Sequence, residues 1–324
     1  MLASNRLREY RLGADMTQAE AALAVRVTQP TYQRWETGGK VPAGKLAALA
    51  KLFNATQERL LGINPPIKAV FYDNGAPDDQ QYYGEVSIHF VSGGAPLVLS
   101  ISEKARMQFS EAMMETSYFI PIRSLTNQLV AIRRDAIADI YFCSEAYDDF
   151  GPEHKTYEFP SSLRYPDNRD WEIIESIVCD FDDGKYDAES VAQLTRTLCG
   201  PPDDVIEQDL AAGRVSIAQV EEMKRKVPLV LDEAENLALL CVYQISPGKR
   251  RKIFIDSDRN IYDAFSDIYS GEYMPSYGSK YVEGVGYHHY LFMNPTVLDF
   301  ISVPTHKYQM GMAQAEAAGD EDDE

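Results

Sequence analysis

The chain contains 324 residues, of which 45% are hydrophobic, and it carries a formal net charge of −19 at pH 7. This length predicts two or three domains, and the apolar fraction is sufficient for packed cores. No stretch approaches the ~20 consecutive apolar residues that span a bilayer, and the charged N-terminus lacks the apolar core of a signal peptide. We therefore expect a cytoplasmic protein without membrane association.

The charge is distributed unevenly along the chain. Residues 1–64, called the head below, contain nine lysines and arginines against five acidic residues, a net charge of +4 that leaves −23 for the remainder. A basic segment attached to an acidic body is the pattern of a protein whose nucleic-acid contact is confined to one domain. The acidic body, residues 65–324, should repel DNA and weaken non-specific binding.

The head predicts five short helices, of which the first covers approximately residues 4–12. Thr17 and Glu20, three positions apart before an apolar run, form the capping box of a second helix. Thr28 is the expected N-cap of a third helix, and the proline two positions later fits a first turn because that position needs no amide donor. Gly38–Gly39 ends this helix as a C-terminal glycine cap.

The second half of the head continues in short helices. A fourth helix begins at Pro42, and its apolar residues recur at helical spacing through Phe53. Thr56 caps a short fifth helix that closes at Gly62. The following Asn64–Pro65–Pro66 is a stiff break, which predicts a domain boundary between the head and the body.

Residues 65–160 predict a first α+β module, in which apolar alternation is punctuated by turn residues. Its predicted elements are strands at 67–72, 86–91 and 97–101, a helix at 102–115, and strands at 129–133 and 136–142. Residues 161–228 predict a helical segment. Its candidate helices lie at 171–180, 188–198, 202–212 and 217–226.

Residues 229–308 predict a second α+β module, and residues 309–324, which end in an acidic run, predict a disordered tail. The module's predicted elements are strands at 237–245 and 252–255, a helix at 259–270, and strands at 290–293 and 297–303. After its first predicted strand, at 67–72, the first module has the order β-β-α-β-β, and the second module has the same order. Phe109–Met113 resembles Phe265–Tyr269, and Arg133–Ile140 matches the hydrophobic pattern of Asn294–Ile301, which indicates a duplication.

The stretch TQAEAALAVRVTQPTYQRWETG, residues 17–38, carries the most specific signal in the chain. Ala22 is small where two helices would cross, and Tyr32 and Trp35 share one face of the third helix. The stretch closely resembles the helix-turn-helix of the phage-repressor family, also called Cro/C1 or XRE, over residues 4–62. The resemblance implies an all-α, five-helix DNA-binding domain whose third helix enters the major groove.

Burial of one face of the third helix turns the other face toward solvent, and side chains near its N-terminus can then reach base edges. The candidate base contacts are Thr28, Gln29, Pro30, Gln33 and Arg34. Arg34 can make a bidentate contact to guanine, and Gln29 can make one to adenine. Because one short helix reads only a few base pairs, we expect a homodimer on a palindromic double-stranded DNA operator.

Three residues are candidate contacts to DNA phosphates. They are Gln18, Thr31 and Lys40. The resemblance implies that Gln18, at the start of the second helix, is a phosphate clamp, and helix N-termini present free amides to anions. The resemblance also implies a buried ion pair between Arg11 and Glu36, which would hold the first helix to the third.

The turn between the second and third helices departs from the family pattern. Where relatives usually have a glycine in a left-handed conformation, this chain has Arg26. A residue with a Cβ atom costs on the order of 1 kcal/mol in that conformation. The departure leaves the geometry of this turn open, while the fold of the head is still expected.

Lys249–Lys252, a run of four basic residues in a predicted hairpin, is an accessory candidate. Its members are Lys249, Arg250, Arg251 and Lys252. The run could contact the DNA backbone or an acidic partner. The alternative, which we favour, is a solvated turn that also blunts a strand edge.

The second module also contains a run of tyrosines, at positions 269, 273, 277 and 281, and one histidine pair. The tyrosines could line a ligand pocket or an interface, although half-buried packing is the favoured interpretation. His288 and His289 would point to opposite faces of a strand, which argues against a shared metal ion. The four cysteines lack metal-binding spacing, and no nucleotide-binding or catalytic motif occurs. We expect no enzymatic activity, no cofactor and no metal.

The sequence thus predicts a multidomain prokaryotic or phage protein with an all-α head and an α+β body. The leading functional hypothesis is a sequence-specific transcriptional regulator, acting as a dimeric repressor. The body would provide oligomerisation, or sense a small-molecule or protein effector. The alternative is an antitoxin-like or defence-system module, in which the body binds a partner protein and the head provides autoregulation.

Overall fold

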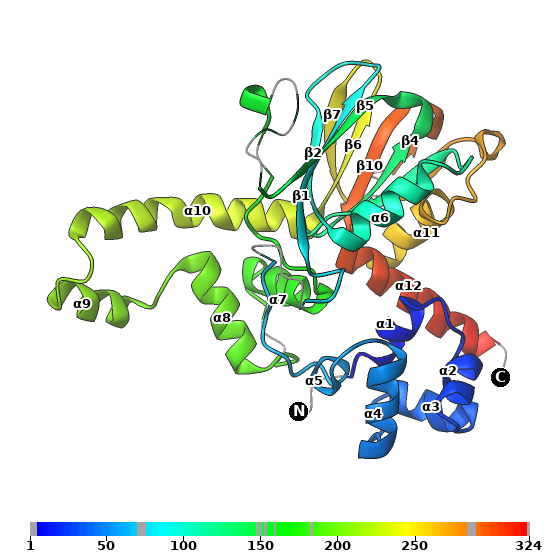
Figure 1. Cartoon of the computed structure of the whole chain (residues 1–324), viewed down its shortest axis with the longest axis horizontal. Helices are drawn as coiled ribbons and strands as arrows, with labels where there is room; N and C mark the ends of the chain where they lie inside the picture. The colour runs from blue at the N-terminus through cyan, green and yellow to red at the C-terminus, as the bar shows by residue number, and fades with distance from the viewer. Residues whose placement is uncertain are drawn as a thin grey trace.

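A computed structural model describes residues 5–69, 76–146, 149, 151, 154–158, 160–181, 184–283 and 290–322. It has an all-helical head followed by a body of helices and sheets (Figure 1), so the predicted multidomain fold class is confirmed. In the described part of the chain, no helix is both long enough and apolar enough to cross a membrane.

The head is built from short helices whose ends follow the predicted caps. They are α1 (Leu7–Leu12), α2 (Gln18–Ala24), α3 (Gln29–Glu36), α4 (Ala43–Leu52) and α5 (Gln57–Leu60). The capping box is formed, since the Thr17 hydroxyl accepts from the amide of Glu20 at 3.2 Å and the Glu20 carboxylate accepts from the amide of Thr17 at 2.8 Å. Thr28 lies at the N-cap of α3 without a side-chain cap, because its hydroxyl instead bonds the Thr31 hydroxyl at 2.9 Å.

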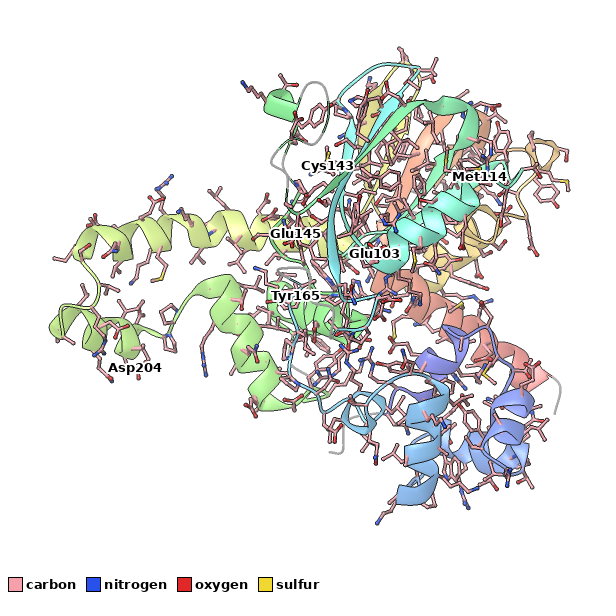
Figure 2. The ribbon with its side chains drawn as sticks, in the orientation of Figure 1. Glu103, Met114, Cys143, Glu145, Tyr165 and Asp204 are labelled. Atoms are coloured by element: carbon pink, nitrogen blue, oxygen red, sulfur yellow. The ribbon has the colours of Figure 1, made fainter. Side chains whose placement is uncertain are left out.

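The first module contains one strand, β3, that its sequence does not predict. Its elements are β1 (Tyr82–Phe90), β2 (Leu97–Ser102), α6 (Glu103–Ala112), β3 (Phe119–Arg123), β4 (Gln128–Arg133) and β5 (Ile137–Ser144). The predicted strand at 67–72 is not seen over 67–69, and its remaining residues lie outside the described ranges. Figure 2 labels Glu103 at the start of α6 and Met114 just beyond its end, with the helix lying along the sheets.

The second module repeats this order of elements. It contains β6 (Leu240–Ile245), β7 (Lys249–Phe254), α11 (Asp258–Tyr269), β8 (Lys280–Glu283), β9 (Tyr290–Met293) and β10 (Leu298–Pro304). In each module a 3₁₀ turn leads directly into the last strand, at Arg134–Ala136 and at Pro295–Val297. Strands β3 and β8 are the elements that the sequence analysis missed in the two modules.

Among the described residues the strands form three sheets. Their orders are β2-β1-β5, β3-β4-β10-β6-β7 and β8-β9, with antiparallel neighbours throughout. The five-stranded sheet is the middle layer of the body. One of its faces packs on α11, with Phe265 in the core, and the other packs on α6 and the β2-β1-β5 sheet, with Phe109 in the core.

The helical segment contains α7 (Asn168–Val178), α8 (Ala188–Cys199), α9 (Asp203–Ala211) and α10 (Ile217–Leu239). The predicted end of the last helix near residue 226 is wrong, since α10 continues through Pro228 and leads directly into β6. Trp171 is fully buried where α7, α8 and α10 meet. The expected boundary at residue 229 therefore falls inside a helix.

The C-terminal tail also differs from the prediction of disorder from residue 309. Residues 305–322 form α12, which packs on α11 and reaches α1 of the head (Figure 1). The reason is that its first turns are anchored in the body. Tyr308 is buried and contacts the ring of Tyr269, while Lys307 is paired with Glu175 at 2.8 Å.

Candidate nucleic-acid interface

The core of the head fixes the orientation of α3. Tyr32 is fully buried and Trp35 is 3% exposed, and their rings meet edge to face at 6.4 Å between centroids. Ala22 is buried where α2 packs on α3, so a larger side chain would separate the two helices. Because Tyr32 and Trp35 face inward, the opposite face of α3 points away from the core.

The predicted base contacts lie on this outward face. Thr28, Gln29, Pro30 and Arg34 are exposed, whereas Thr31 and Gln33 are half-buried, and Lys40 is exposed beyond the helix. Figure 1 shows α3 and α4 on the side of the head that points away from the sheets. The body therefore leaves the predicted recognition surface accessible.

Arg26 holds the turn between α2 and α3 in the left-handed conformation that glycine favours, with φ of 57°. Lys45 of α4 stabilises the turn, because its ammonium group donates to the carbonyl oxygens of Val25 at 2.7 Å and of Arg26 at 3.2 Å. The departure from the family pattern is therefore accommodated without a change of turn geometry.

We expect Arg26→Gly to raise the free energy of unfolding of the head by about 1 kcal/mol, since glycine adopts a positive φ without a Cβ clash. Hydrogen exchange of head peptides in the full chain would measure this. Ala47→Gly is the matched control, because position 47 is exposed within α4 and the same substitution there should destabilise by roughly 0.5–1 kcal/mol. If Arg26→Gly lowers the free energy of unfolding as Ala47→Gly does, the left-handed conformation of Arg26 is not strained.

Arg11 and Glu36 meet in the interior of the head. The guanidinium Nε donates to Glu36 Oε1 at 2.7 Å, and Arg11 also donates to the carbonyl oxygen of Met16 at 2.8 Å. Gln18 joins this cluster, since its amide donates to Glu36 Oε2 at 3.0 Å and its side chain is buried. The structure thus turns the predicted phosphate clamp toward Glu36, away from solvent.

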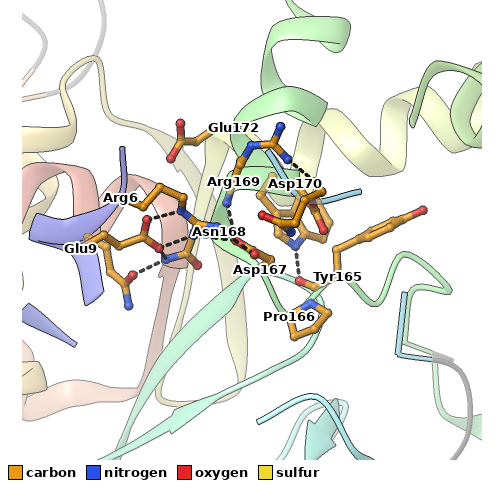
Figure 3. A network of polar contacts seen from close by, with 12 residues as sticks. Arg6, Glu9, Tyr165, Pro166, Asp167, Asn168, Arg169, Asp170 and Glu172 are labelled. Carbon is orange, nitrogen blue, oxygen red and sulfur yellow. Dashed lines mark hydrogen bonds and ion pairs between the residues drawn. The ribbon is translucent and has the colours of Figure 1, made fainter. Parts of the chain in front are cut away.

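The same cluster connects the head to the body. Glu316 of α12 lies 2.6 Å from an Arg11 nitrogen and 3.6 Å from Arg8 Nε. A second connection starts at Arg6, which pairs with Asp167 at the start of α7 at 2.6 Å (Figure 3). None of the head–body partners is marked by a local motif, because the pairing residues are far apart in the chain.

Two carboxylates at the start of α7 have opposite electrostatic environments (Figure 3). Burial would raise the pKa of Asp167, but the charge and hydrogen bonds of Arg6 outweigh it and lower the pKa to about 2. Burial and then the negative charge of Asp167 raise the pKa of Asp170 to about 8. Asp170 is fully buried and accepts from the amide of Ile67, in the linker that follows the head, at 3.3 Å.

The accessory basic run does not form one surface. Arg250 turns inward, where it donates to the carbonyl oxygen of Pro96 at 2.7 Å and lies over the ring of Phe300. Lys249, Arg251 and Lys252 are exposed, and Lys252 donates to Asn236 at 2.7 Å. Strand β7 lies at the opposite end of the body from α3 (Figure 1), so the structure does not bring this run to the predicted DNA surface.

The tyrosine run divides between the interior and the surface. Tyr269 and Tyr273 are buried in the α11 core, whereas Tyr277 and Tyr281 are exposed. The favoured interpretation, packing within the module, therefore describes only the first two, and these are buried rather than half-buried. The histidine pair at 288 and 289 lies outside the described residues.

The comparisons with known proteins bear on the head. Residues 7–60 match a protein-family model described as Helix-turn-helix. The comparisons with curated proteins and with solved structures gave no significant match. The matched range begins at α1 and ends in α5, and it contains all the candidate DNA contacts of the head.

Proposed function

We propose, on the premise that residues 7–60 form a helix-turn-helix DNA-binding domain of the XRE type, that this protein is a sequence-specific transcriptional repressor. One observation carries the proposal: Thr28, Gln29, Pro30 and Arg34 are exposed at α3, which lies on the side of the head that faces away from the sheets (Figure 1). A single α3 reads too few base pairs for useful specificity. The repressor would therefore bind a palindromic operator as a homodimer.

The body would set the position of the head in response to a signal. A cavity of about 300 Å³ lies between head and body, and its wall includes Arg8 and Glu36 from the head and Glu172, Tyr186 and Met310 from the body. This volume is at the lower end of small-molecule sites. A ligand that binds there with different affinity in two head positions would shift the population between them.

The test is DNA binding by the full chain across a salt series, with the DNA upstream of its own gene as the first probe. Arg34→Ala should weaken binding to the preferred site by about 1–3 kcal/mol and relax the preference at one base pair. Lys40→Ala should weaken binding to all sequences and lower the salt dependence by about one phosphate contact.

Arg251→Ala is the matched control, because it removes an exposed arginine of β7, a strand at the far end of the body from α3 (Figure 1). It should leave both the affinity and the salt dependence unchanged. If Arg34→Ala binds every sequence as the unaltered chain does, α3 is not the recognition helix. A partner protein that co-purifies and replaces DNA would instead favour the interaction-module alternative.

A further inference from the structure

The two modules agree in strand pairing as well as in element order. The last strand of each module pairs antiparallel with its first strand, β5 with β1 and β10 with β6. Both ladders contain a register shift at the same place, beside the 3₁₀ turn. In the first module the shift lies where His89 and Phe90 of β1 pair with the start of β5, and in the second it lies between Leu298 and Phe300 at the start of β10. The duplication indicated by the sequence therefore extends to an irregularity of the sheet, which allows residues of one module to be assigned to residues of the other.

The hairpin β3–β4 of the first module does not extend its own sheet. After β4 the 3₁₀ turn redirects the chain, and β4 pairs with β10 of the second module, with Ile132 opposite Phe300 and Val130 opposite Ser302. The hairpin nevertheless keeps Ile132 in the core around α6 of its own module. The five-stranded sheet is thus the β7-β6-β10 sheet of the second module, completed by a hairpin from the first.

The reciprocal pairing is not made within the chain. The β2-β1-β5 sheet of the first module has three strands, and the β8–β9 hairpin forms a separate sheet of two. In the described ranges, no strand pairs with the outer edge of β5 or with the outer edge of β9. Unpaired strand edges of this kind add another strand readily.

Side-chain exposure marks the same two edges. Aligning Arg133–Ile140 with Asn294–Ile301 places Phe292 at the position of Ala131. Ala131 is fully buried between β10 and the α11 core, but Phe292 is 71% exposed. On β5, Phe142 contacts Phe109 of α6 and is still 36% exposed. The hydrophobic core around α6 is therefore partly exposed to solvent at the unpaired edge of β5.

We infer that the β8–β9 hairpin of one copy pairs with the β5 edge of a second copy, and that two such pairings close a two-fold symmetric dimer. The alignment sets the register, with Met293 opposite Asp139, and Leu291 opposite Tyr141. Phe292 would then cover the open core beside Phe142. The inference rests on the dimeric part of the proposed function, to which it assigns a surface.

The hairpin cannot reach β5 of its own chain in this arrangement. Val282 and Met293 are buried in the α11 core, so the hairpin is held to the second module. This matches the first module, where the hairpin remains anchored by Ile132 while its outer edge pairs elsewhere. A second copy, which carries the same two open edges, is the partner that satisfies both of them together.

Disulfide cross-linking tests the register directly. In the full chain with Cys143, Cys179 and Cys199 replaced by serine, Tyr141→Cys and Leu291→Cys should give a covalent dimer on a non-reducing denaturing gel, because residues opposite each other in a ladder are within disulfide reach. Mixing the two single variants should also give it, which only an intermolecular contact allows. Val91→Cys, also exposed, replaces Tyr141→Cys in the control pair.

A charge on the edge provides a second test. Phe292→Lys should convert the dimer to a monomer by mass in solution, with at least about a tenfold rise in the dimer dissociation constant. Its far-UV circular dichroism should be unchanged, because Phe292 is exposed. Leu229→Lys, on an exposed position of α10, is the control that should remain dimeric.

Each other outcome overturns either the inference or the proposed function. A monomeric unaltered chain, a dimer that survives Phe292→Lys, or a cross-link confined to one chain overturns the assigned interface. If the dimer binds specific DNA and survives Phe292→Lys, the proposed function stands and the interface is wrong. If the chain dimerises through these strands and binds no specific DNA, the inference stands and the proposed function is wrong.

Discussion

Arg11→Met should destabilise the head by about 3–5 kcal/mol, because it removes one partner of a buried ion pair and leaves the other charged. The side chain of Glu36 is fully buried, and its shortest salt bridge is the 2.7 Å contact to Arg11. The next cation, Arg8 Nε, lies 3.7 Å away. A loss of this size is comparable to the whole stability of a domain of this length.

Hydrogen exchange of the full chain, resolved to peptides, would measure this effect separately in head and body. Protection should fall in α1, α2 and α3, while the sheets of the body should keep theirs. Glu316→Gln is the matched control, since it removes the contact of a partly exposed α12 residue with Arg11 and leaves the inner pair, and should cost about 1 kcal/mol or less.

Arg11→Met combined with Glu36→Leu separates burial of a charge from loss of packing. Because the double variant leaves no unpaired charge in the core, it should recover much of the stability that the single variant loses. If the double variant is as unstable as Arg11→Met, the ion pair is not the origin of the effect.

Asp170→Asn should change how the stability of the protein depends on pH. A buried carboxyl whose pKa is raised to about 8 holds its proton in the folded chain at pH values where the unfolded chain has released it. The contribution of Asp170 to the free energy of unfolding should therefore be largest below about pH 4. It should decline by up to about 1.4 kcal/mol per pH unit as the pH rises toward 8.

The amide in Asp170→Asn does not titrate, and its oxygen can still accept from the amide of Ile67. The variant should match the unaltered chain near pH 4 and be more stable at pH 8, as denaturant unfolding at several pH values would show. Asp167→Asn is the opposite control, because it removes the partner of Arg6 and should destabilise at neutral pH. A constant difference between Asp170→Asn and the unaltered chain from pH 5 to 9 would contradict the raised pKa.

The helices of the head could be predicted from the sequence because their signals are local. The Thr17–Glu20 capping box and the glycines after α3 act within a few residues of the chain. The burial of Tyr32 and Trp35 follows from their spacing on one helix. The pairing of Arg11 with Glu36 was predicted from the family resemblance, and the two side chains form that ion pair in the structure.

The order of strands and helices in the two modules could also be predicted from local patterns, apart from β3 and β8. β8 is four residues long, and β3 contains Pro121, which weakens a strand pattern. The extension of α10 through Pro228 and the ordering of α12 were not available. In both places contacts with distant residues override the local preference.

By itself, then, the sequence determined the helix-turn-helix head, its candidate recognition residues and the duplication of the body. Only the tertiary structure decided that Gln18 turns toward Glu36, that Arg250 turns inward, and that Arg6 meets Asp167 across 161 positions of the chain. It also decided that β4 pairs with the other module and that β5 is left with an open edge. Local periodicity specifies which face of a strand is apolar, but the neighbour beside that strand depends on the packing of the whole chain.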